Sequence, residues 1–243
     1  MKSRVPLQHY VYFHILLESK EDRNHDNSAF FYPKLGPGQM WECAARKFEE
    51  MGGVIHTNCS VLKINKKNSK IKSLTCAMDG EPIEVETDIV ISTMPIKDLI
   101  IGMNDVPGNI IDIASHLCYR DFVTVSLLVP KLNINVDSST KTLGNIIPDT
   151  WIYIQDKRRK LARVQIYNNW SPYLVADPEN TVWVGLEYFC NEGDDFWNLS
   201  DEEAIRLGAE ELCRMGVIND PSEVIMSHRE KVKKAYPAYF DTY

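Results

Sequence analysis

The spacing of apolar residues in the first fifty positions favours two helices. From Val5 to Lys20, aromatic and aliphatic side chains recur at intervals that fit an α-helix. After Gly38, apolar side chains recur every three or four residues and stop at the pair Gly52-Gly53, which predicts a helix with one apolar stripe. The residues of this stripe are Met40, Trp41, Ala44, Phe48 and Met51.

Beyond Gly53 the hydrophobic period shortens to that of β-strands. Apolar and polar residues alternate within 54–64 and 73–78, and the turn-prone stretches NKKNSK and MDGEP bound these segments. The segments therefore predict a small strand-rich meander. The continuous apolar run Asp88–Ser92 leads to Pro95 and predicts a strand that is buried on both faces.

The second half of the chain predicts a larger sheet with flanking helices. In SDEEAIRLGAEELCRMG, Ser200 and Glu203 have the capping-box spacing, and Gly216 ends the predicted helix. A further helix is expected at Asn109–Leu117, and strands are expected at Phe122–Val129, Trp151–Ile154, Arg163–Trp170, Thr181–Phe189 and Glu223–Ala235. We therefore expect an α+β fold: a mostly antiparallel sheet with flanking helices, joined to a small portion made of one helix and the meander.

Composition and charge narrow the classes of function. The chain has 243 residues, of which 44% are hydrophobic and 25% charged, as in an ordinary globular protein. A formal net charge of -7 argues against general binding of nucleic acid, and we expect the basic cluster at 157–160 to be a solvated turn. No apolar run approaches the roughly 20 residues of a transmembrane helix, so we expect no membrane-spanning segment.

The reactive side chains form no catalytic or metal-binding motif. Six cysteines are scattered singly without a C-x-x-C pair, which is typical of a reducing cytoplasm. The six histidines lack metal-ligand spacing, so we predict no metal site. Neither a G-x-S-x-G elbow nor a Walker loop occurs. In NEGDDFW, we interpret the carboxylates of Glu192, Asp194 and Asp195 as solvated rather than catalytic.

The stretch FFYPKLGPGQMWE, residues 30–42, has only part of a phosphate-binding loop. A dinucleotide fingerprint needs a third glycine where Trp41 stands, and Pro37 has no N–H to donate. We therefore interpret Gly36–Gly38 as the entry loop of a helix. Tyr32 in this stretch and Tyr236 near the other end carry rings suited to stacking on a planar ligand or a sugar, and equally suited to packing at strand ends.

Several of these segments, in their order along the chain, resemble the FAD-dependent amine oxidase and protoporphyrinogen oxidase superfamily, and especially its UDP-galactopyranose mutase-like branch. The segments are FFYPKLGPGQMWECAARKFEEMGGVIHTNCSVLKI, DIVISTMP, WIYI, NNWSP and AYP. The resemblance covers nearly the whole chain. It implies a lead-in helix of the substrate domain at 1–29, part of the FAD domain at 30–105 and a substrate-binding domain at 106–243.

The resemblance also implies roles for individual residues. FAD would be contacted by Val61, through its backbone at the adenine, and by Gly36, Gly38, Ser92 and Thr93 near the flavin. An anionic or sugar substrate would be met by Tyr32, Arg120, Arg163 and Tyr236, since arginine binds diphosphate through two parallel hydrogen bonds. No catalytic residue is assigned. The implied substrate is a small molecule such as a nucleotide sugar, in line with the branch's association with lipopolysaccharide and cell-surface sugar synthesis.

The chain also departs from the family pattern. Such enzymes begin with a strand and G-x-G-x-x-G and end with a glycine-containing segment at the flavin's pyrophosphate, and this sequence has neither. We therefore expect an internal fragment or a truncated reading frame. Without these phosphate contacts, it is expected to retain no FAD and to be inactive by itself.

Two kinds of chemistry fit the resemblance, and one alternative comes from a different class. An oxidase would use the flavin to accept hydride, whereas a mutase would use reduced flavin at the anomeric carbon of a nucleotide sugar. The alternative is a stand-alone carbohydrate-binding or scaffolding module without flavin. Its glycan contacts would come from Trp151, Trp170, Trp183 and Trp197.

Overall fold

The computed structural model describes residues 31–134 and 140–238, so the helix expected at Val5–Lys20 lies outside the described residues. The contacts of the chain divide it into two compact units. Unit 1 comprises the described residues of Met1–Glu50, Thr124–Glu187 and Ser200–Arg229, and unit 2 those of Met51–Val123, Tyr188–Leu199 and Glu230–Tyr243. Strands β4 (Cys118–Val129), β7 (Val182–Cys190) and β8 (Met226–Ala238) contribute residues to both units.

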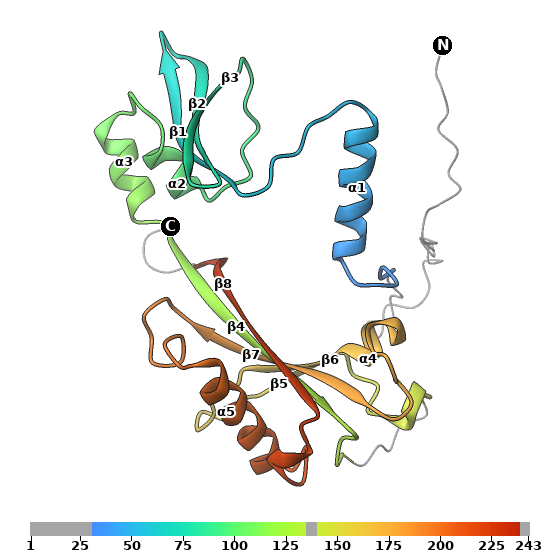
Figure 1. Ribbon diagram of the computed structural model, residues 1–243. Helices are drawn as coiled ribbons and strands as arrows, with labels where there is room; N and C mark the ends of the chain where they lie inside the picture. The colour runs from blue at the N-terminus through green and yellow to red at the C-terminus, as the bar shows by residue number, and fades with distance from the viewer. Residues whose placement is uncertain (1–30, 135–139, 239–243) are drawn as a thin grey trace, which may run out of the picture. The chain divides into compact units, whose positions relative to one another are not determined.

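A five-stranded sheet has the strand order β5-β6-β7-β4-β8 (Figure 1). Strand β5 (Trp151–Tyr153) pairs antiparallel with β6 (Arg163–Ile166), and β6 pairs antiparallel with β7. Together with its helices, this sheet gives the α+β fold expected from the sequence.

The core of unit 1 lies on one face of its strands. Because the pleat sends alternate side chains to opposite faces, strands β4, β6 and β7 contribute every second residue to this core. The helix α5 (Asp201–Arg214) adds buried side chains along one stripe. Buried apolar residues of these elements include Val125, Leu127, Val164, Ile166, Val184, Leu186, Ala204 and Leu212. The other face of β5, β6 and β7 is left for polar and aromatic side chains.

Shorter helical segments connect the strands of unit 1. They are η1 (Leu143–Asn145), α4 (Tyr167–Trp170), η2 (Pro172–Leu174) and η3 (Pro221–Glu223). Helix α1 (Gly38–Glu50) has the bounds expected from the sequence, but none of its residues is buried within the described part of the chain. Trp41 is 67% exposed and Met51 is 86% exposed, so the apolar stripe of α1 faces solvent there.

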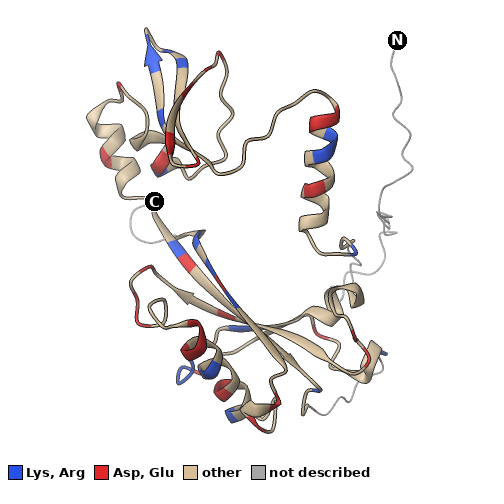
Figure 2. Cartoon of the chain, viewed as in Figure 1, with Lys and Arg blue, Asp and Glu red and all other residues tan. Residues whose placement is uncertain are grey.

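The start of helix α5 confirms the predicted capping box. The Ser200 hydroxyl accepts a hydrogen bond from the Glu203 N–H at 3.2 Å, and the Glu203 carboxylate accepts one from the Ser200 N–H at 2.9 Å. Three acidic residues occupy the first turn and Arg214 the last turn, where each sign of charge suits the helix dipole (Figure 2). Gly216, with φ of +74°, then ends the helical segment.

Unit 2 contains the predicted meander. Strands β1 (Cys59–Lys67), β2 (Lys70–Met78) and β3 (Glu81–Glu86) form a three-stranded antiparallel sheet in chain order. Tight turns at 68–69 and 79–80 join them, and all four residues have positive φ. The short helices α2 (Ile96–Ile101) and α3 (Gly108–Ser115) follow.

The meander has one apolar and one polar face. Ile64 is 1% exposed and Cys76 is 3% exposed on the apolar face. On the polar face the Asn65 amide donates to the hydroxyls of Ser73 and Thr75 at 3.1 and 3.0 Å. Since these three side chains come from two neighbouring strands, the bonds fix the register of β1 on β2.

Three strand predictions are wrong in part or in full. The run Asp88–Ser92 is not a strand, and Ile89 and Ile91 are 80% and 90% exposed. An apolar run becomes a buried strand only when a neighbouring sheet edge pairs with it, and no described segment does so here. The strand predicted at Arg163–Trp170 ends at Ile166 and continues as helix α4.

A side chain explains the second of these errors. The Asn168 amide donates to the Thr181 carbonyl at 2.9 Å and accepts from the Trp183 N–H at 3.0 Å. Such side-chain bonds to backbone compete with a strand ladder, so they favour the helical turn. In the same way, the Asp220 carboxylate accepts from the Ser222 N–H at 2.8 Å, and a helical turn replaces the first residues of the strand predicted at Glu223–Ala235.

We predict that Ser200→Ala lowers the free energy of unfolding by about 1 kcal/mol, because two N–H groups at the start of α5 lose their partners. Ser200→Asp keeps an acceptor at the cap and is the matched control. Chemical denaturation followed by circular dichroism measures both variants. Equal destabilisation by alanine and aspartate would contradict a capping role for the Ser200 side chain.

Candidate functional site

A buried carboxylate lies at the centre of the polar face of unit 1. Glu187 on β7 is 1% exposed, and the strand register places it beside Arg163 of β6. The Nε and Nη2 atoms of Arg163 bind Oε2 of Glu187, and Nε2 of Gln165 donates to Oε1. Both carboxylate oxygens therefore have partners, as a buried negative charge requires.

Arg163 also lies against two aromatic rings of the neighbouring strand β5. Its Cζ is 5.4 Å from the ring centroid of Trp151 and 5.8 Å from that of Tyr153. A guanidinium over an aromatic face gains a cation–π attraction of about 0.5–1 kcal/mol at such partly exposed positions. Trp151 and Tyr153 are 42% and 63% exposed, so each keeps a side for a ligand.

Two more rings extend this surface. Trp151 meets Trp170 edge to face with 4.9 Å between centroids, and Tyr32 lies 5.1 Å from Trp170. We call the four side chains Tyr32, Trp151, Tyr153 and Trp170 the aromatic ledge. The four rings come from three separate segments of the sequence, and the folding of unit 1 brings these segments together. Adjacent rings with exposed faces suit a sugar ring or a planar base.

A tyrosine that sequence reasoning missed lies behind the ledge. Burial raises the pKa of Tyr167, the hydrogen bond with Ser126 lowers it, and the charge of Glu187 raises it again. Burial and the neighbouring Tyr167 also raise the pKa of Tyr32. Both phenols therefore stay protonated at neutral pH and can donate a hydrogen bond, but they cannot serve as bases there.

Gly185 makes room for Tyr167. A Cβ added at Gly185 would lie 2.3 Å from the Tyr167 hydroxyl oxygen and 2.7 Å from Cζ, which is far inside van der Waals contact. Gly185 and Glu187 share the polar face of β7. The signal in the sequence was a glycine and a carboxylate at alternate positions of the otherwise apolar run VWVGLEYFC.

The loop before α1 belongs to the same unit. Gly36 is buried, has φ of +88°, and donates its N–H to the Pro33 carbonyl at 3.0 Å. The Ser171 hydroxyl donates to the Lys34 carbonyl at 2.7 Å, which fixes the loop next to Trp170. Gly38 is exposed at the first position of α1, and a Cβ there would meet nothing within 4 Å of the described residues.

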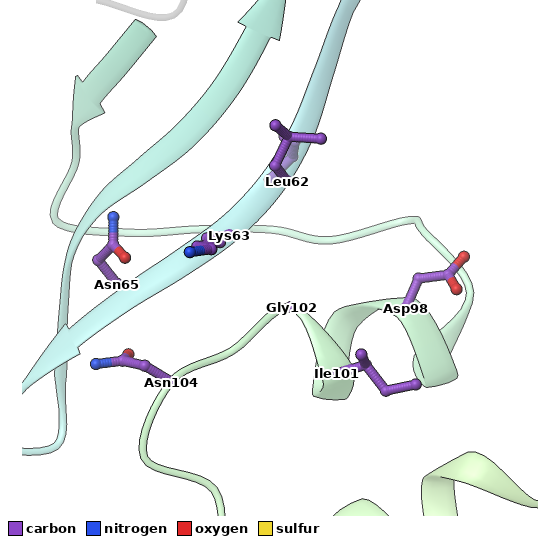
Figure 3. A pocket seen from close by; sticks show the side chains of 8 residues that line it. Leu62, Lys63, Asn65, Asp98, Ile101, Gly102 and Asn104 are labelled. Carbon is purple, nitrogen blue, oxygen red and sulfur yellow. The ribbon is translucent and has the colours of Figure 1, made fainter. Parts of the chain in front are cut away.

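Unit 2 contains an open hollow of about 450 Å³ beside the outer edge of β1. Strand β1 lines one side, and α2 with the turn at Gly102 lines the other (Figure 3). We call it the edge hollow; its lining residues are Val61, Leu62, Lys63, Asn65, Asp98, Ile101, Gly102 and Asn104. Val61, predicted to contact adenine, is thus part of a concave surface.

The edge hollow is closed at one end by backbone pairing. The Ile64 N–H donates to the Gly102 carbonyl at 2.9 Å, and the Asn104 N–H donates to the Ile64 carbonyl at 3.3 Å. The Asn104 side chain then bonds both the N–H and the carbonyl of Lys66, at 2.6 and 3.0 Å. The segment after α2 therefore pairs with the outer edge of β1 at 64–66. This pairing does not extend to Val61.

The other predicted site residues lie elsewhere in unit 2. The Ser92 hydroxyl accepts from the Met94 N–H at 3.3 Å, and Thr93 is exposed in the same loop. The Tyr236 ring is 44% exposed and lies 6.0 Å from Phe189 and 6.4 Å from Phe122 between centroids. Arg120 is half-buried on β4, two residues before Phe122. The structure thus groups Tyr236 with aromatic rings of its own unit, and Tyr32 and Arg163 with the ledge of unit 1.

The acidic loop at 191–195 has structural partners. Glu192 forms an ion pair with Lys233, and Asp194 accepts from the Asn191 N–H at 2.7 Å. The buried Asp121 carboxylate accepts from the N–H groups of Glu192 and Lys234 at 2.5 and 2.7 Å. These bonds account for the conformation of the loop, so its acidic residues need no catalytic role to explain their positions.

The described residues lack two further features. Across 31–134 and 140–238, no group of three or more His, Cys, Asp or Glu side chains has the arrangement of a metal site. No helix in these two ranges is both long and apolar enough to cross a membrane.

We predict that Arg163→Met lowers the free energy of unfolding by about 3–5 kcal/mol, because it leaves the Glu187 carboxylate buried without a counter-charge. Adding Glu187→Gln to that variant should recover part of the loss. Denaturant titration of the two single variants and the double variant gives the coupling energy. Arg158→Met is the control, since Arg158 pairs with Asp156 at the surface and its side chain is 86% exposed. A cost no larger than that of the control would refute the burial argument.

We predict that Gly185→Ala costs about 1–3 kcal/mol of stability, because the new methyl group overlaps the Tyr167 ring. Gly38→Ala, at the open first position of α1, should be neutral in the same thermal-unfolding assay. The double variant Gly185→Ala/Tyr167→Ala should be no less stable than Tyr167→Ala alone. An unaltered melting temperature for Gly185→Ala would show that the packing of Tyr167 on Gly185 is not tight.

No protein-family model matches the sequence. No curated protein matches it at a significant level. Among solved structures, the chain is similar to a reduced UDP-galactopyranose mutase, with 17% identity over 87% of this chain and a TM-score of 0.68. It is also similar to a triple mutant of putrescine oxidase with redesigned cofactor binding (16% identity over 83% of this chain, TM-score 0.56) and to an oxidoreductase from Methanosarcina mazei (17% over 80%, TM-score 0.54).

The chain spans 42% of the length of each of these three proteins. At such low identities the likeness concerns the fold. The similarity that the sequence motifs suggested is therefore confirmed at that level: the chain has the fold of the matching part of a UDP-galactopyranose mutase and of two oxidoreductases.

Proposed function

We propose that this chain is the substrate-binding portion, with part of the FAD-binding portion, of a flavin-dependent oxidoreductase or UDP-galactopyranose mutase-like enzyme. The observation that carries the proposal is the fold likeness to the mutase over 87% of this chain. In this assignment, 30–105 belongs to the FAD domain and 106–243 is the substrate domain, and the lead-in segment expected at 1–29 lies outside the described residues. FAD is the cofactor of the complete protein.

The residues of unit 2 fit one part of FAD. The edge hollow offers a concave surface beside Val61, where β1 is not covered by the segment after α2. A free strand edge presents N–H and carbonyl groups, which match the donor and acceptor pattern of adenine. Ser92 and Thr93 remain the proposed flavin contacts of unit 2. Gly36 and Gly38 belong to unit 1 and keep the same proposed role there.

The pyrophosphate of FAD has no comparable partner in this sequence. No G-x-G-x-x-G segment is present, and Pro37 removes one N–H from the glycine pair at the start of α1. Cofactor binding to the chain alone is therefore proposed to be too weak for retention. When bound, FAD would supply the redox or nucleophilic chemistry, and the residues of this chain would bind and orient the substrate.

The aromatic ledge favours a nucleotide sugar over an apolar amine. Trp151 and Tyr153 combine exposed ring faces with polar tips, and Arg163 lies behind these two rings. Tyr32 is half-buried beside Trp170. Because Glu187 compensates the charge of Arg163, we assign to Arg163 mainly the positioning of Trp151 and Tyr153. Arg120 and Tyr236 remain the proposed contacts for an anionic or sugar group in unit 2.

The same proposal extends to the biological setting. A nucleotide sugar as substrate would fit lipopolysaccharide or cell-surface sugar synthesis, and the singly scattered cysteines favour a cytoplasmic enzyme.

We predict that the chain binds UDP-galactose more tightly than galactose, measured by isothermal titration calorimetry. Trp151→Ala should weaken this binding by about tenfold, because stacking of a planar group on an aromatic ring is worth roughly 1–3 kcal/mol. Trp183→Phe changes a tryptophan outside the ledge and should leave the affinity unaltered.

The alternative function gives a different outcome in this titration. A stand-alone carbohydrate-binding module would bind galactose or a glycan as well as it binds the nucleotide sugar. Such a result, or the absence of any binding that depends on Trp151, would contradict the assignment of the ledge to a nucleotide sugar.

A further inference from the structure

Two cysteines lie next to each other on neighbouring strands of unit 2. Cys59 is the first residue of β1 and pairs with Met78 of β2. Cys76 lies two residues before Met78 and pairs with Val61, which lies two residues after Cys59. Since side chains two residues apart point to the same face, both thiols are on one face of the sheet as diagonal neighbours. Both are free thiols.

The two thiols differ in access to solvent. Cys76 is 3% exposed, whereas Cys59 is half-buried at the end of its strand. Burial raises the pKa of the Cys76 thiol, and the neighbouring Cys59 raises it further. An external disulfide therefore reaches Cys59 first, and Cys76 is protected until its neighbour has reacted.

The backbone geometry allows only a strained bond between them, and the strands must shift to form it. Diagonal neighbours across an antiparallel pair have Cα atoms roughly 7–8 Å apart, somewhat beyond the usual disulfide span of about 4.4–6.8 Å. The ladder of β1 on β2 is irregular between Val61 and Lys63, and such a bulge increases the local twist and lets the strand bend. A disulfide formed here would carry strain, and strained disulfides are the easily reduced ones.

We propose that Cys59 and Cys76 are a redox-active pair that forms a reversible disulfide by exchange with a small disulfide such as oxidised glutathione. The Cys59 thiolate attacks one glutathione sulfur, the glutathione S–S bond breaks, and the first glutathione leaves as a thiolate that takes up a proton. Cys76 then loses its proton and attacks the Cys59 sulfur, and the second glutathione leaves in the same way. Two protein thiols are oxidised, and one glutathione disulfide is reduced to two glutathione molecules.

The pair lies next to the edge hollow. Cys76 pairs directly with Val61, which lines the hollow, so a bond from Cys59 to Cys76 joins the two strands at that residue. An effect of oxidation on adenine binding rests on the function proposed above, but the disulfide does not. An experiment can therefore reject the disulfide without rejecting the proposed function, and the reverse also holds.

The test is peptide mapping of the folded chain after incubation with oxidised glutathione at low protein concentration. The remaining thiols are alkylated before digestion and mass spectrometry. We expect one peptide pair to be linked through Cys59 and Cys76, and dithiothreitol to restore all six thiols to alkylation. Cys118→Ser, which removes an exposed thiol outside the pair, should leave the link intact.

Two variants keep the proposal falsifiable. Cys59→Ser should abolish the link. Cys76→Ser should keep one glutathione bound to Cys59, because no second thiol is present to displace it. Circular dichroism checks that both variants are folded. The proposal is overturned if wild-type protein keeps glutathione on Cys59 with Cys76 unmodified. It is equally overturned if both thiols stay reduced under conditions that oxidise Cys118.

Discussion

The burial of the Glu187 carboxylate constrains the candidate site more than any other feature. A carboxylate with 1% exposure is stable only if both oxygens and the charge are matched, and Arg163 and Gln165 of the next strand do this. The same contacts fix the register of β6 on β7 and hold the Arg163 guanidinium beside the rings of Trp151 and Tyr153. The aromatic ledge therefore depends on the neutralised ion pair of Arg163 and Glu187, which lies against two of its rings.

A second constraint acts on the meander of unit 2. Ile64 and Lys66 bond to the segment after α2, partly through an asparagine side chain that substitutes for a strand. This pairing ends before Val61 and leaves the edge hollow beside it. A sheet edge that is covered at one end and concave at the other is a natural place for a flat polar ligand. The Cys59 and Cys76 thiols lie at this same end of β1.

Local features were predictable from the sequence because their causes are local. The capping box at Ser200 and the turns of the meander depend on residues a few positions apart, and the structure has them where they were expected. The partners of Glu187 are 22 and 24 residues away, so no short motif reveals them. The clash that requires Gly185 depends on how Tyr167 packs, which spacing does not encode.

The errors have a physical cause as well. The run Asp88–Ser92 has the composition of a buried strand, but a strand needs a partner edge, and composition does not supply one. The Asn168 side chain turned a predicted strand into a helical turn through two bonds to distant backbone. The motifs that suggested the flavoenzyme family were sufficient for the fold, because their order along the chain reflects the order of its elements.

The most direct test of the central claim, a substrate-binding portion with only part of an FAD site, is an NMR titration of the isotope-labelled chain with FAD. The account predicts shifts of the backbone amides of Val61–Lys63 and Gly102 at high FAD concentration, and a colourless protein after desalting. Flavin that stays bound through desalting would contradict the claim that the pyrophosphate contacts are missing. An unchanged spectrum around the edge hollow would contradict the assignment of that hollow to adenine.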